Sequence, residues 1–317
     1  MQTIYLSHPF DHSSLSSEPT VFALGYFDGV HKGHQYVIKQ AVDYANENNM
    51  TSAVMTFHPH PKEVLQQLKQ PMRFLTPLPD KLAKLAELGV DRTYVVEFNQ
   101  SFADLLPKEF VHQYLISLGA RHVVAGFDFS YGKWGKGTME TLPQHAEDAF
   151  SQTSVSKVEK EGIKVSSTAL RALLQEGRVE DVPELLGSYY QVQGTVEDGE
   201  KRGRTIGFPT ANIKLSQRYL IPKLGVYVVE VKIGSSSYMG MCNVGYKPTF
   251  HNERPDVPNI EVHLLDFDKQ IYGETVHISW LLRIRDEKRF NGIDELKEQL
   301  ALDKQQTETF AKGHKLD

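Results

Sequence analysis

Residues 25–34, Gly-Tyr-Phe-Asp-Gly-Val-His-Lys-Gly-His, constrain the fold of this chain more than any other stretch. They follow an apolar segment at 21–24 that is predicted to be a strand, and they lead into an apolar stripe at helical spacing over 33–48. A junction of strand, glycine turn and helix places backbone N–H groups and the positive end of a helix dipole beside an arriving anion. The stretch therefore predicts a phosphate-binding turn.

The residue types in this turn fit that role. Gly25, Gly29 and Gly33 carry no side chain that would block a phosphate. His31 and His34 add two imidazoles that can meet the phosphate as cations or as hydrogen-bond donors. Two other interpretations stay open: half of a metal site, although the nearby sequence has no further ligand at suitable spacing, or two surface histidines in a loop.

Other glycine-rich phosphate motifs do not occur here. The chain has no G-x-x-x-x-G-K-[ST] and no G-x-G-x-x-G after a strand. The string resembles the H-x-G-H signature of nucleotidyltransferases, and the flanking Gly-Tyr-Phe-Asp-Gly-Val narrows the resemblance to FAD synthetases. This resemblance implies that His31 and His34 contact ATP phosphates while an adenylyl group is transferred.

The first half of the chain alternates predicted strands and helices, which predicts a parallel sheet covered on both faces. Ligands bind such sheets at the carboxyl ends of the strands. The strands are expected at 3–6, 21–24, 52–57, 93–98 and 122–125, and the helices at 33–48, 79–88 and 107–118. Four unusual segments each follow a strand and are expected to meet at one edge: 25–34, 58–61, 97–99 and 126–132.

A second signal is Ser-Ser-Thr-Ala-Leu-Arg at 166–171. By itself it indicates only a well-capped helix. Beside the first motif it resembles the second nucleotidyltransferase signature, which implies that Ser167, Thr168 and Arg171 bind nucleotide phosphates. The same resemblance places further residues at the nucleotide, namely Gly25, Phe27, Asp28 and Gly33. At FMN we expect His58, Pro59 and Asp128; the prolines of 58–61 favour a ligand-facing wall over a metal pair formed by its histidines.

From about residue 186 the pattern changes to short strands separated by turn residues, which predicts an antiparallel β-barrel. The strands are expected at 190–196, 225–233, 238–244, 260–266 and 275–282, followed by a helix at 292–310. We therefore expect two domains, 1–186 and 187–317, each with its own core.

Two stretches of the second half call for more than a structural explanation. Residues 203–212 join a basic, glycine-rich loop to a Thr and an Asn. Residues 260–267 place Glu261 and His263 on one face of an apolar strand, where an unpaired carboxylate is costly. With Gly-Tyr-Lys-Pro-Thr-Phe at 245–250, these strings closely resemble riboflavin kinase. Relatives often carry Arg at the position of Lys247. Lys keeps the positive charge, but it lacks the bidentate hydrogen-bond donor that Arg provides.

Both sets of signatures, in this order, resemble the bacterial bifunctional riboflavin kinase/FAD synthetase family over nearly the whole chain. The resemblance implies a Rossmann-like nucleotidyltransferase domain that adenylylates FMN with ATP to give FAD, and a barrel domain that phosphorylates riboflavin with ATP to give FMN. It makes Glu261 the base for the riboflavin hydroxyl. It places Mg²⁺ at Thr210, with Asn212 beside it, and a loop at 202–207 over the ATP. The other kinase residues expected at the nucleotide are Gly203, Gly207, Phe208 and Pro209.

Composition argues against other classes of protein. The 317 residues carry a formal net charge of −5, which disfavours non-specific nucleic-acid binding. Cys242 is the single cysteine, so no internal disulfide is expected. Neither a secretory signal nor an apolar run of membrane-crossing length is visible, and we expect a cytoplasmic protein with no membrane partner.

Two rival hypotheses remain at this point. One is a flavin-binding or sensing protein that has lost chemistry, and the other is a homologue in which only the kinase is active. Both predict the loss of catalytic side chains, yet His31, His34, Arg171 and Glu261 are all present. The sequence permits an oligomer without specifying one.

Overall fold

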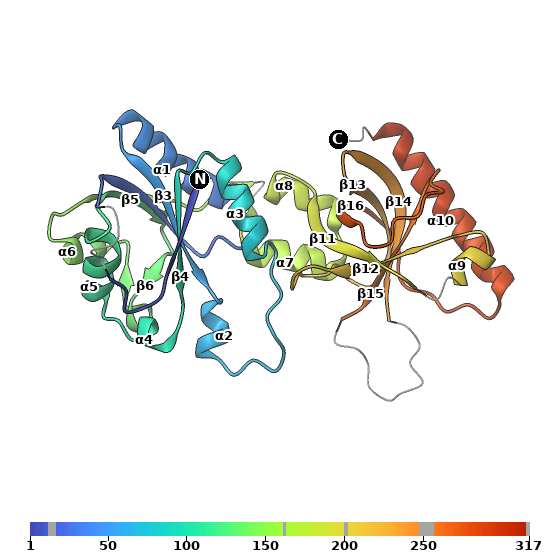
Figure 1. Cartoon of the computed structure of the whole chain (residues 1–317), viewed down its shortest axis with the longest axis horizontal. Coiled ribbons are helices and arrows are strands. Elements are labelled where there is room, and N and C mark those ends of the chain that lie inside the picture. The colour runs from blue at the N-terminus through green and yellow to red at the C-terminus, as the bar shows by residue number, and fades with distance from the viewer. Residues whose placement is uncertain (12–16, 161–162, 200–201, 247–256, 315–317) are drawn as a thin grey trace. The chain divides into compact units, whose positions relative to one another are not determined.

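The computed structural model describes residues 1–11, 17–160, 163–199, 202–246 and 257–314 (Figure 1). The chain divides into two compact units, Met1–Ser167 and Thr168–Asp317. Lys247 and the rest of the 247–250 string expected at the kinase site lie outside the described residues, as do the side chains of Arg202 and Arg204.

The first unit is built on a six-stranded sheet in which every neighbouring pair is parallel, with the strand order β1-β4-β3-β2-β5-β8. The predicted parallel sheet is confirmed. The strands are β1 (Gln2–Leu6), β2 (Thr20–Leu24), β3 (Thr51–His58), β4 (Arg92–Glu97), β5 (Ala120–Gly126) and β8 (Ser151–Val155). Strand β8 was not predicted, because it is an edge strand in which only Val155 is buried.

Alternate residues of β2 explain how both faces of this sheet are covered. Val21 and Ala23 pack with the buried stripe of helix α1 (Lys32–Glu47). Phe22 and Leu24 pack in an aromatic cluster on the other face. All five residues of β2 are buried, as expected of a central strand of a parallel sheet.

The first unit contains several further helices. The helix predicted at 107–118 consists of α5 (Pro107–Phe110) and a π-helical turn, Val111–Ile116. The remaining helices are α2 (Pro61–Leu65), α3 (Leu78–Glu87), α4 (Gln100–Ala103), a short 3-10 helix Lys133–Gly135, and α6 (Leu142–Ala146). Two two-stranded ribbons complete the unit: β6 (Ser130–Tyr131) with β7 (Gly137–Thr138), and β9 (Glu159–Lys160) with β10 (Ile163–Lys164).

The second unit contains the predicted antiparallel barrel, closed in the order β11-β12-β15-β14-β13-β16. Helix α10 (Ile293–Gly313), predicted at 292–310, packs along β13 and β14 (Figure 1). The strands are β11 (Tyr190–Glu197), β12 (Ala211–Leu215), β13 (Gly225–Ile233), β14 (Ser236–Gly245), β15 (Asn259–Leu264) and β16 (Thr275–Arg285). Strand β12 was not predicted, because only Ile213 of its five residues is buried and the apolar signal is weak.

Helices α7 (Ser167–Glu176) and α8 (Val182–Leu186), with the 3-10 turn Val179–Asp181 between them, pack with the barrel. The N–H of Lys223 donates to the Leu174 carbonyl at 2.9 Å, and the N–H of Arg283 donates to the Glu180 carboxylate at 3.4 Å. The compact units therefore divide between Ser167 and Thr168, while the sequence pattern changes near 186. The functional boundary at 186 stays a prediction.

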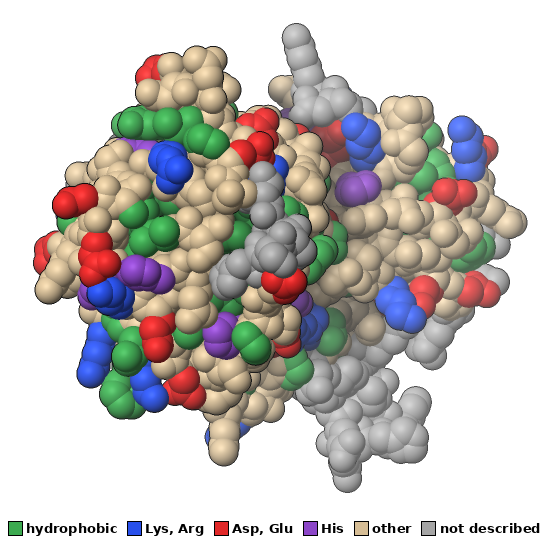
Figure 2. Space-filling view, turned by 60° about the vertical axis from the view of Figure 1, so that its left-hand side comes forward, with side chains coloured by type: hydrophobic (Ala, Val, Ile, Leu, Met, Phe, Trp, Pro, Cys, Tyr) green, Lys and Arg blue, Asp and Glu red, His purple; other side chains and the backbone are tan. Residues whose placement is uncertain are grey.

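Charged side chains of both signs are spread over the surface. On the face drawn in Figure 2, Lys and Arg are interspersed with Asp and Glu, and the described residues there form no continuous basic patch. Among the helices that the structure describes, none is long and apolar enough to cross a membrane.

Candidate active sites

The turn between β2 and α1 has an unusual backbone. Phe27, Gly29 and Val30 have φ values of 55°, 90° and 45°, a region that non-glycine residues rarely adopt. Phe27 and Val30 are only 2% and 1% exposed, so burial of their side chains holds the turn in this shape. Phe27 was expected at the nucleotide. Its side chain instead packs in the core and supports the turn from the buried side.

The two histidines of the turn are in direct contact. His31 is the N-cap of α1, and its Nδ1 accepts a hydrogen bond from the His34 N–H at 3.2 Å. The rings stack with centroids 3.6 Å apart, and Phe27 packs edge-on against His34 at 5.2 Å. Because Nδ1 of His31 accepts, its neutral ring carries the proton on Nε2, which can donate to a phosphate oxygen.

Burial sets the charge of both rings. It lowers the pKa of His31 to about 4, although Asp28 and Asp128 act in the opposite direction. Burial also lowers the pKa of His34 well below its usual value, and the charges of His31 and Lys81 add to the effect. The imidazoles are therefore neutral at pH 7, which favours hydrogen-bond donation over the cationic role.

Asp28 anchors a distant segment to the turn, and Gly33 leaves space beside the His31 ring. The Asp28 carboxylate is 5% exposed and accepts hydrogen bonds from the Leu75 and Thr76 N–H groups at 3.0 and 3.1 Å. It thus anchors the segment before α3 to the turn. A Cβ on Gly33 would lie 3.2 Å from the His31 ring and 3.6 Å from a backbone oxygen, so glycine keeps the start of α1 open.

The second signature begins where the first unit ends. The Ser167 hydroxyl donates to the Asp28 carbonyl at 2.8 Å, which joins the two signatures. Helix α7 starts at Ser167, as the Ser-Ser-Thr pattern indicates. Thr168 and Arg171 lie on α7 in the second unit.

The four segments expected at one edge of the sheet do follow adjacent parallel strands, β2 to β5. The Phe98 N–H donates to the His58 carbonyl at 3.1 Å, and the rings of Tyr26 and His60 are 4.2 Å apart. The His60 Nδ1 accepts from the Lys62 N–H at 3.0 Å and caps α2, which explains this histidine without a metal. Pro59 is half-buried beside it. In the described part of the chain no cluster of three or more His, Cys, Asp or Glu could hold a metal ion.

Asp128 lies on the segment that follows β5 and is exposed. Its carboxylate forms an ion pair with Lys164 at 2.9 Å, and the Lys164 ammonium stands 5.2 Å from the centre of the Phe127 ring. Beside the larger effect of burial, the Asp128 charge raises the pKa of His31 and the Lys164 charge lowers it. Sequence reasoning identified Asp128 but missed Lys164.

In the second unit, a cavity of about 620 Å³ lies between the barrel and α10. Glu261 and His263 both line it, as expected for side chains on one face of β15. Arg285 closes the α10 side by donating to both carboxylate oxygens of Asp303 at 2.7 to 3.1 Å. The other lining residues are Gly203, Thr205, Ile206, Phe208, Thr210, Val226, Met241, Asn243, Glu287, Lys288, Phe290, Ile293, Leu296 and Leu300.

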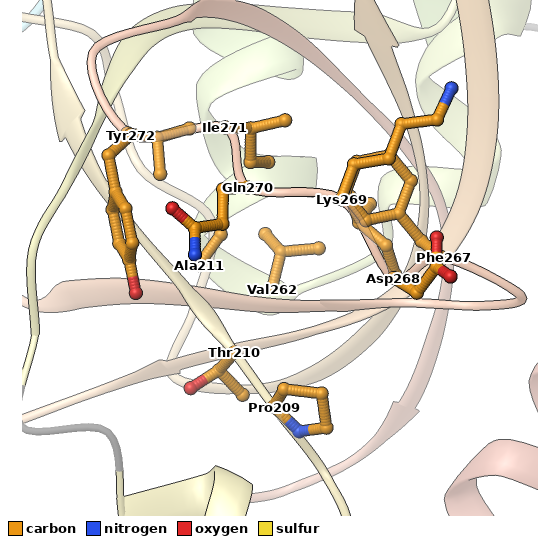
Figure 3. A pocket seen from close by; sticks show the side chains of 12 residues that line it. Pro209, Thr210, Ala211, Val262, Phe267, Asp268, Lys269, Gln270, Ile271 and Tyr272 are labelled. Carbon is orange, nitrogen blue, oxygen red and sulfur yellow. The ribbon is translucent and has the colours of Figure 1, made fainter.

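A second cavity, of about 430 Å³, is shown in Figure 3. Pro209 and Thr210 lie at the bottom of this view, and Ala211 lies beside the Gln270 amide at mid-height. Thr210 also lines the cavity beside Glu261, so one residue borders both spaces. The sequence analysis assigned no role to the loop 267–272, although the polar residues between Phe267 and Tyr272 were an available signal.

His263 fixes the backbone that leads into β12 and carries Thr210. Its Nδ1–H donates to the Pro209 carbonyl at 2.7 Å, and its ring packs against Phe208 at 5.4 Å. Burial lowers the pKa of His263, although its bond to Pro209 acts in the opposite direction. A histidine of the 260–267 string thus holds the backbone beside Thr210.

Close backbone approaches explain the glycines of the 203–207 loop. The Phe208 N–H donates to the Gly203 carbonyl at 2.9 Å, and a Cβ on Gly203 would lie 2.2 Å from the Phe208 carbonyl oxygen. Gly207 has a φ of 88°, which favours glycine. Asn212 pairs in register with Glu261 across β12 and β15, but it is not among the residues that line either cavity.

Family models match both halves of the chain: FAD synthetase over residues 13–169 and riboflavin kinase over residues 186–311. Relatives from Bacillus subtilis and Listeria monocytogenes are each named bifunctional riboflavin kinase/FMN adenylyltransferase. They are 50% and 47% identical to this chain, over 96% and 98% of its length and 97% and 98% of theirs. The chain belongs to the bifunctional riboflavin kinase/FMN adenylyltransferase family.

A solved structure supports the same fold for this family member. A protein from Streptococcus pneumoniae, described as a macrolide-efflux protein, is 36% identical and superposes with a TM-score of 0.88. The match covers 97% of this chain and 99% of that one. That description concerns the Streptococcus protein alone, and the likeness bears on the fold of both compact units.

Lys81 is a further residue that sequence reasoning missed in this family member. It lies on α3 and is 2% exposed, and its Nζ donates to the Tyr26 carbonyl at 2.7 Å. Lys81 lies four residues before Leu85, which is fully buried, on a predicted helix. Residues at this spacing share one face of a helix, so the sequence already indicated that Lys81 faces the core.

Proposed function

We propose that this chain carries out two steps of flavin cofactor synthesis: it phosphorylates riboflavin with ATP to give FMN, then transfers AMP from a second ATP to FMN, giving FAD and pyrophosphate. The observation that carries the proposal is the family match over nearly the whole chain, with His31, His34, Arg171 and Glu261 all present. We assign the adenylyltransferase to residues 1–186 and the kinase to residues 187–317.

The two cavities of the second unit suit two kinase substrates. Cavities of their size accommodate drug-sized ligands. We assign riboflavin to the larger cavity, beside Glu261 and α10, and ATP to the one in Figure 3. Thr210 borders both, so the γ-phosphate would meet the riboflavin hydroxyl there.

Phosphoryl transfer to a neutral hydroxyl needs a base. Glu261 would accept the proton as the hydroxyl oxygen bonds to the γ-phosphorus and ADP leaves. His263 would hold Pro209, and therefore the Thr210 backbone, in place during the step. Gly203 and Phe208 line the larger cavity and Thr210 borders both cavities, so the glycines of the 203–207 loop would allow its backbone to approach the phosphates where the two substrates meet.

The residues around Thr210 fit a magnesium ion. Thr210 and Asn212 offer side-chain oxygens, which Mg²⁺ prefers, and Mg²⁺ usually takes few protein ligands besides substrate phosphates. A Cβ on Gly199 would lie 1.9 Å from Asn212 Nδ2, so glycine at 199 leaves room for the Asn212 amide. When bound, Mg²⁺ supplies neutralising charge to the ATP phosphates.

In the adenylyltransferase assigned to residues 1–186, an FMN phosphate oxygen would attack the α-phosphorus of ATP and pyrophosphate would leave. No protein nucleophile is required. The Nε2–H of His31, the His34 ring and the N-terminus of α1 would stabilise the negative charge that develops on the phosphates. The signature also assigns this role to Ser167, Thr168 and Arg171. We place FMN at His58, Pro59 and Asp128.

Incubation with riboflavin, ATP and Mg²⁺, followed by chromatography of the flavins, tests the proposal. We expect FMN first and FAD later. FMN alone would indicate a kinase-only homologue. Flavin binding without either product would indicate a sensing protein, and both results would contradict the bifunctional assignment.

A further inference from the structure

Lys81 is a buried cation directly behind the histidine turn. Its Nζ donates to the Tyr26 carbonyl at 2.7 Å and to the Thr56 hydroxyl at 3.3 Å, and it stands 4.1 Å from the centre of the Tyr26 ring. The Thr56 hydroxyl itself donates to the Tyr26 carbonyl at 2.9 Å. The Tyr26 carbonyl therefore accepts hydrogen bonds from two donors, the Lys81 ammonium and the Thr56 hydroxyl.

Burying an ammonium group at 2% exposure has a large desolvation cost, and an apolar side chain would avoid that cost. The cost is offset in part by the Asp28 carboxylate, whose charge favours the protonated lysine. The field of Lys81 also reaches His34, since its charge lowers the pKa of that histidine. Both turn histidines are neutral at pH 7, so Lys81 supplies positive charge that they lack.

We propose that Lys81 is a positioning residue for adenylyl transfer: it fixes the Tyr26 carbonyl, and with it the 25–31 turn, and it holds a positive charge behind the place where the nucleotide phosphates bind. This inference rests on the adenylyltransferase function proposed for the first unit. Lys81 acts through the turn and through its field, without contact with the substrate.

The charge of Lys81 changes within a measurable pH range. Burial lowers its pKa to about 8, against the effect of Asp28. The titratable or charged groups that face it are Asp28 and Tyr26 from the turn and His34 from α1, while β3 contributes the Thr56 hydroxyl. His34 stays neutral throughout pH 7 to 9, so it adds no change of charge in that range. Adenylyl transfer should therefore lose kcat/KM for ATP above pH ~8, by about tenfold per pH unit.

Bound ATP shifts this dependence. The negative phosphates favour the protonated lysine, so the alkaline limb should lie at higher pH in kcat than in kcat/KM. A side chain with only a structural role would produce no such split.

The test measures FAD formation from FMN against pH for the full chain and for Lys81→Met, Lys81→Arg and Lys84→Met. Lys84 is the matched control, because it lies on α3 and its charge interacts with Asp80 and Glu87. We expect Lys81→Met to lose about 10²-fold in kcat/KM for ATP, as when a preorganised donor is removed. Its kcat/KM should also no longer decrease above pH ~8. Lys81→Arg should restore part of the rate and move the limb beyond pH ~9, because guanidinium stays charged. Lys84→Met should behave like the parent, and riboflavin phosphorylation should be unchanged in all three variants.

The outcomes separate this inference from the proposed function. If the parent forms no FAD from FMN, the proposed function fails. If the parent forms FAD but Lys81→Met keeps its rate and its pH profile, the positioning role is wrong. If Lys81→Met does not fold, Lys81→Arg decides, since an alkaline limb that stays near pH 8 in that variant overturns the role of Lys81.

Discussion

His31 accepts a hydrogen bond from the backbone N–H of His34 at 3.2 Å, and the two rings stack at 3.6 Å. One histidine of the signature therefore caps the helix that carries the other. This bond fixes the tautomer of His31 and leaves its Nε2–H as a donor. The short spacing of the signature is thus a geometric requirement, because an N-cap side chain reaches the N–H groups two or three residues later.

We predict that His34→Ala leaves FMN as the end product. The loss of one preorganised donor to a developing phosphate charge costs on the order of 10²–10³-fold in rate. FAD formation from supplied FMN should fall by this factor, while riboflavin phosphorylation serves as the control and stays at the parent rate. Undiminished FAD synthesis would contradict the role of the 25–34 turn.

The low pKa of His31 predicts a dependence of stability on pH. The folded value is about 4 and the ordinary value is 6.5, so between these pH values the unfolded chain binds more protons than the folded chain. The contribution of neutral His31 is fully present above pH 6.5 and is lost as the pH falls toward 4, by up to about 3 kcal/mol.

Denaturant unfolding of His31→Gln at pH 7 and pH 4.5 measures this contribution. The variant should lose less unfolding free energy on acidification than the parent does. His58→Gln is the matched control, because the His58 side chain is exposed. Equal losses in the parent and in His31→Gln would show that His31 is not the buried titrating group.

Glu261→Gln should abolish riboflavin phosphorylation and spare FAD formation from FMN. The amide keeps the shape of the side chain but cannot accept the hydroxyl proton, and loss of a positioned base costs about 10²–10⁴-fold in rate. Chromatography of the flavins with each substrate supplied separately checks both steps. FMN formation at near the parent rate would place the base elsewhere.

Much of the fold was predictable from the sequence, because strand and helix periodicity report burial residue by residue. The parallel edge that brings 58–61 beside 97–99 followed from alternation alone. Strand β12 did not, since its place in the barrel depends on its partners β11 and β15 more than on its own apolar content. The Asp28 carboxylate was expected at the nucleotide, yet it binds two N–H groups more than 45 residues away in sequence. No local pattern encodes such a contact.

The position of the unit boundary bears on how FMN reaches the second step. The sequence suggests that the two sets of motifs separate at 186, whereas the compact units divide inside the second signature, after Ser167. His34 and Glu261 still lie in different units, and neither proposed step attaches FMN covalently to the chain. FMN should therefore leave the kinase site and reach an adenylyltransferase site through solvent, including one on another molecule.

We predict that mixing His34→Ala with Glu261→Gln restores FAD synthesis from riboflavin, although neither variant achieves it alone. His34→Ala supplies FMN, and Glu261→Gln adenylylates it. A lag should precede FAD, and it should shorten as the concentration of the His34→Ala protein rises, because that protein sets the rate of FMN release. Suppose instead that the mixture accumulates FMN without FAD while each variant keeps its own single-step activity. FMN transfer would then be confined to one molecule or assembly, and the two sites would not be independent.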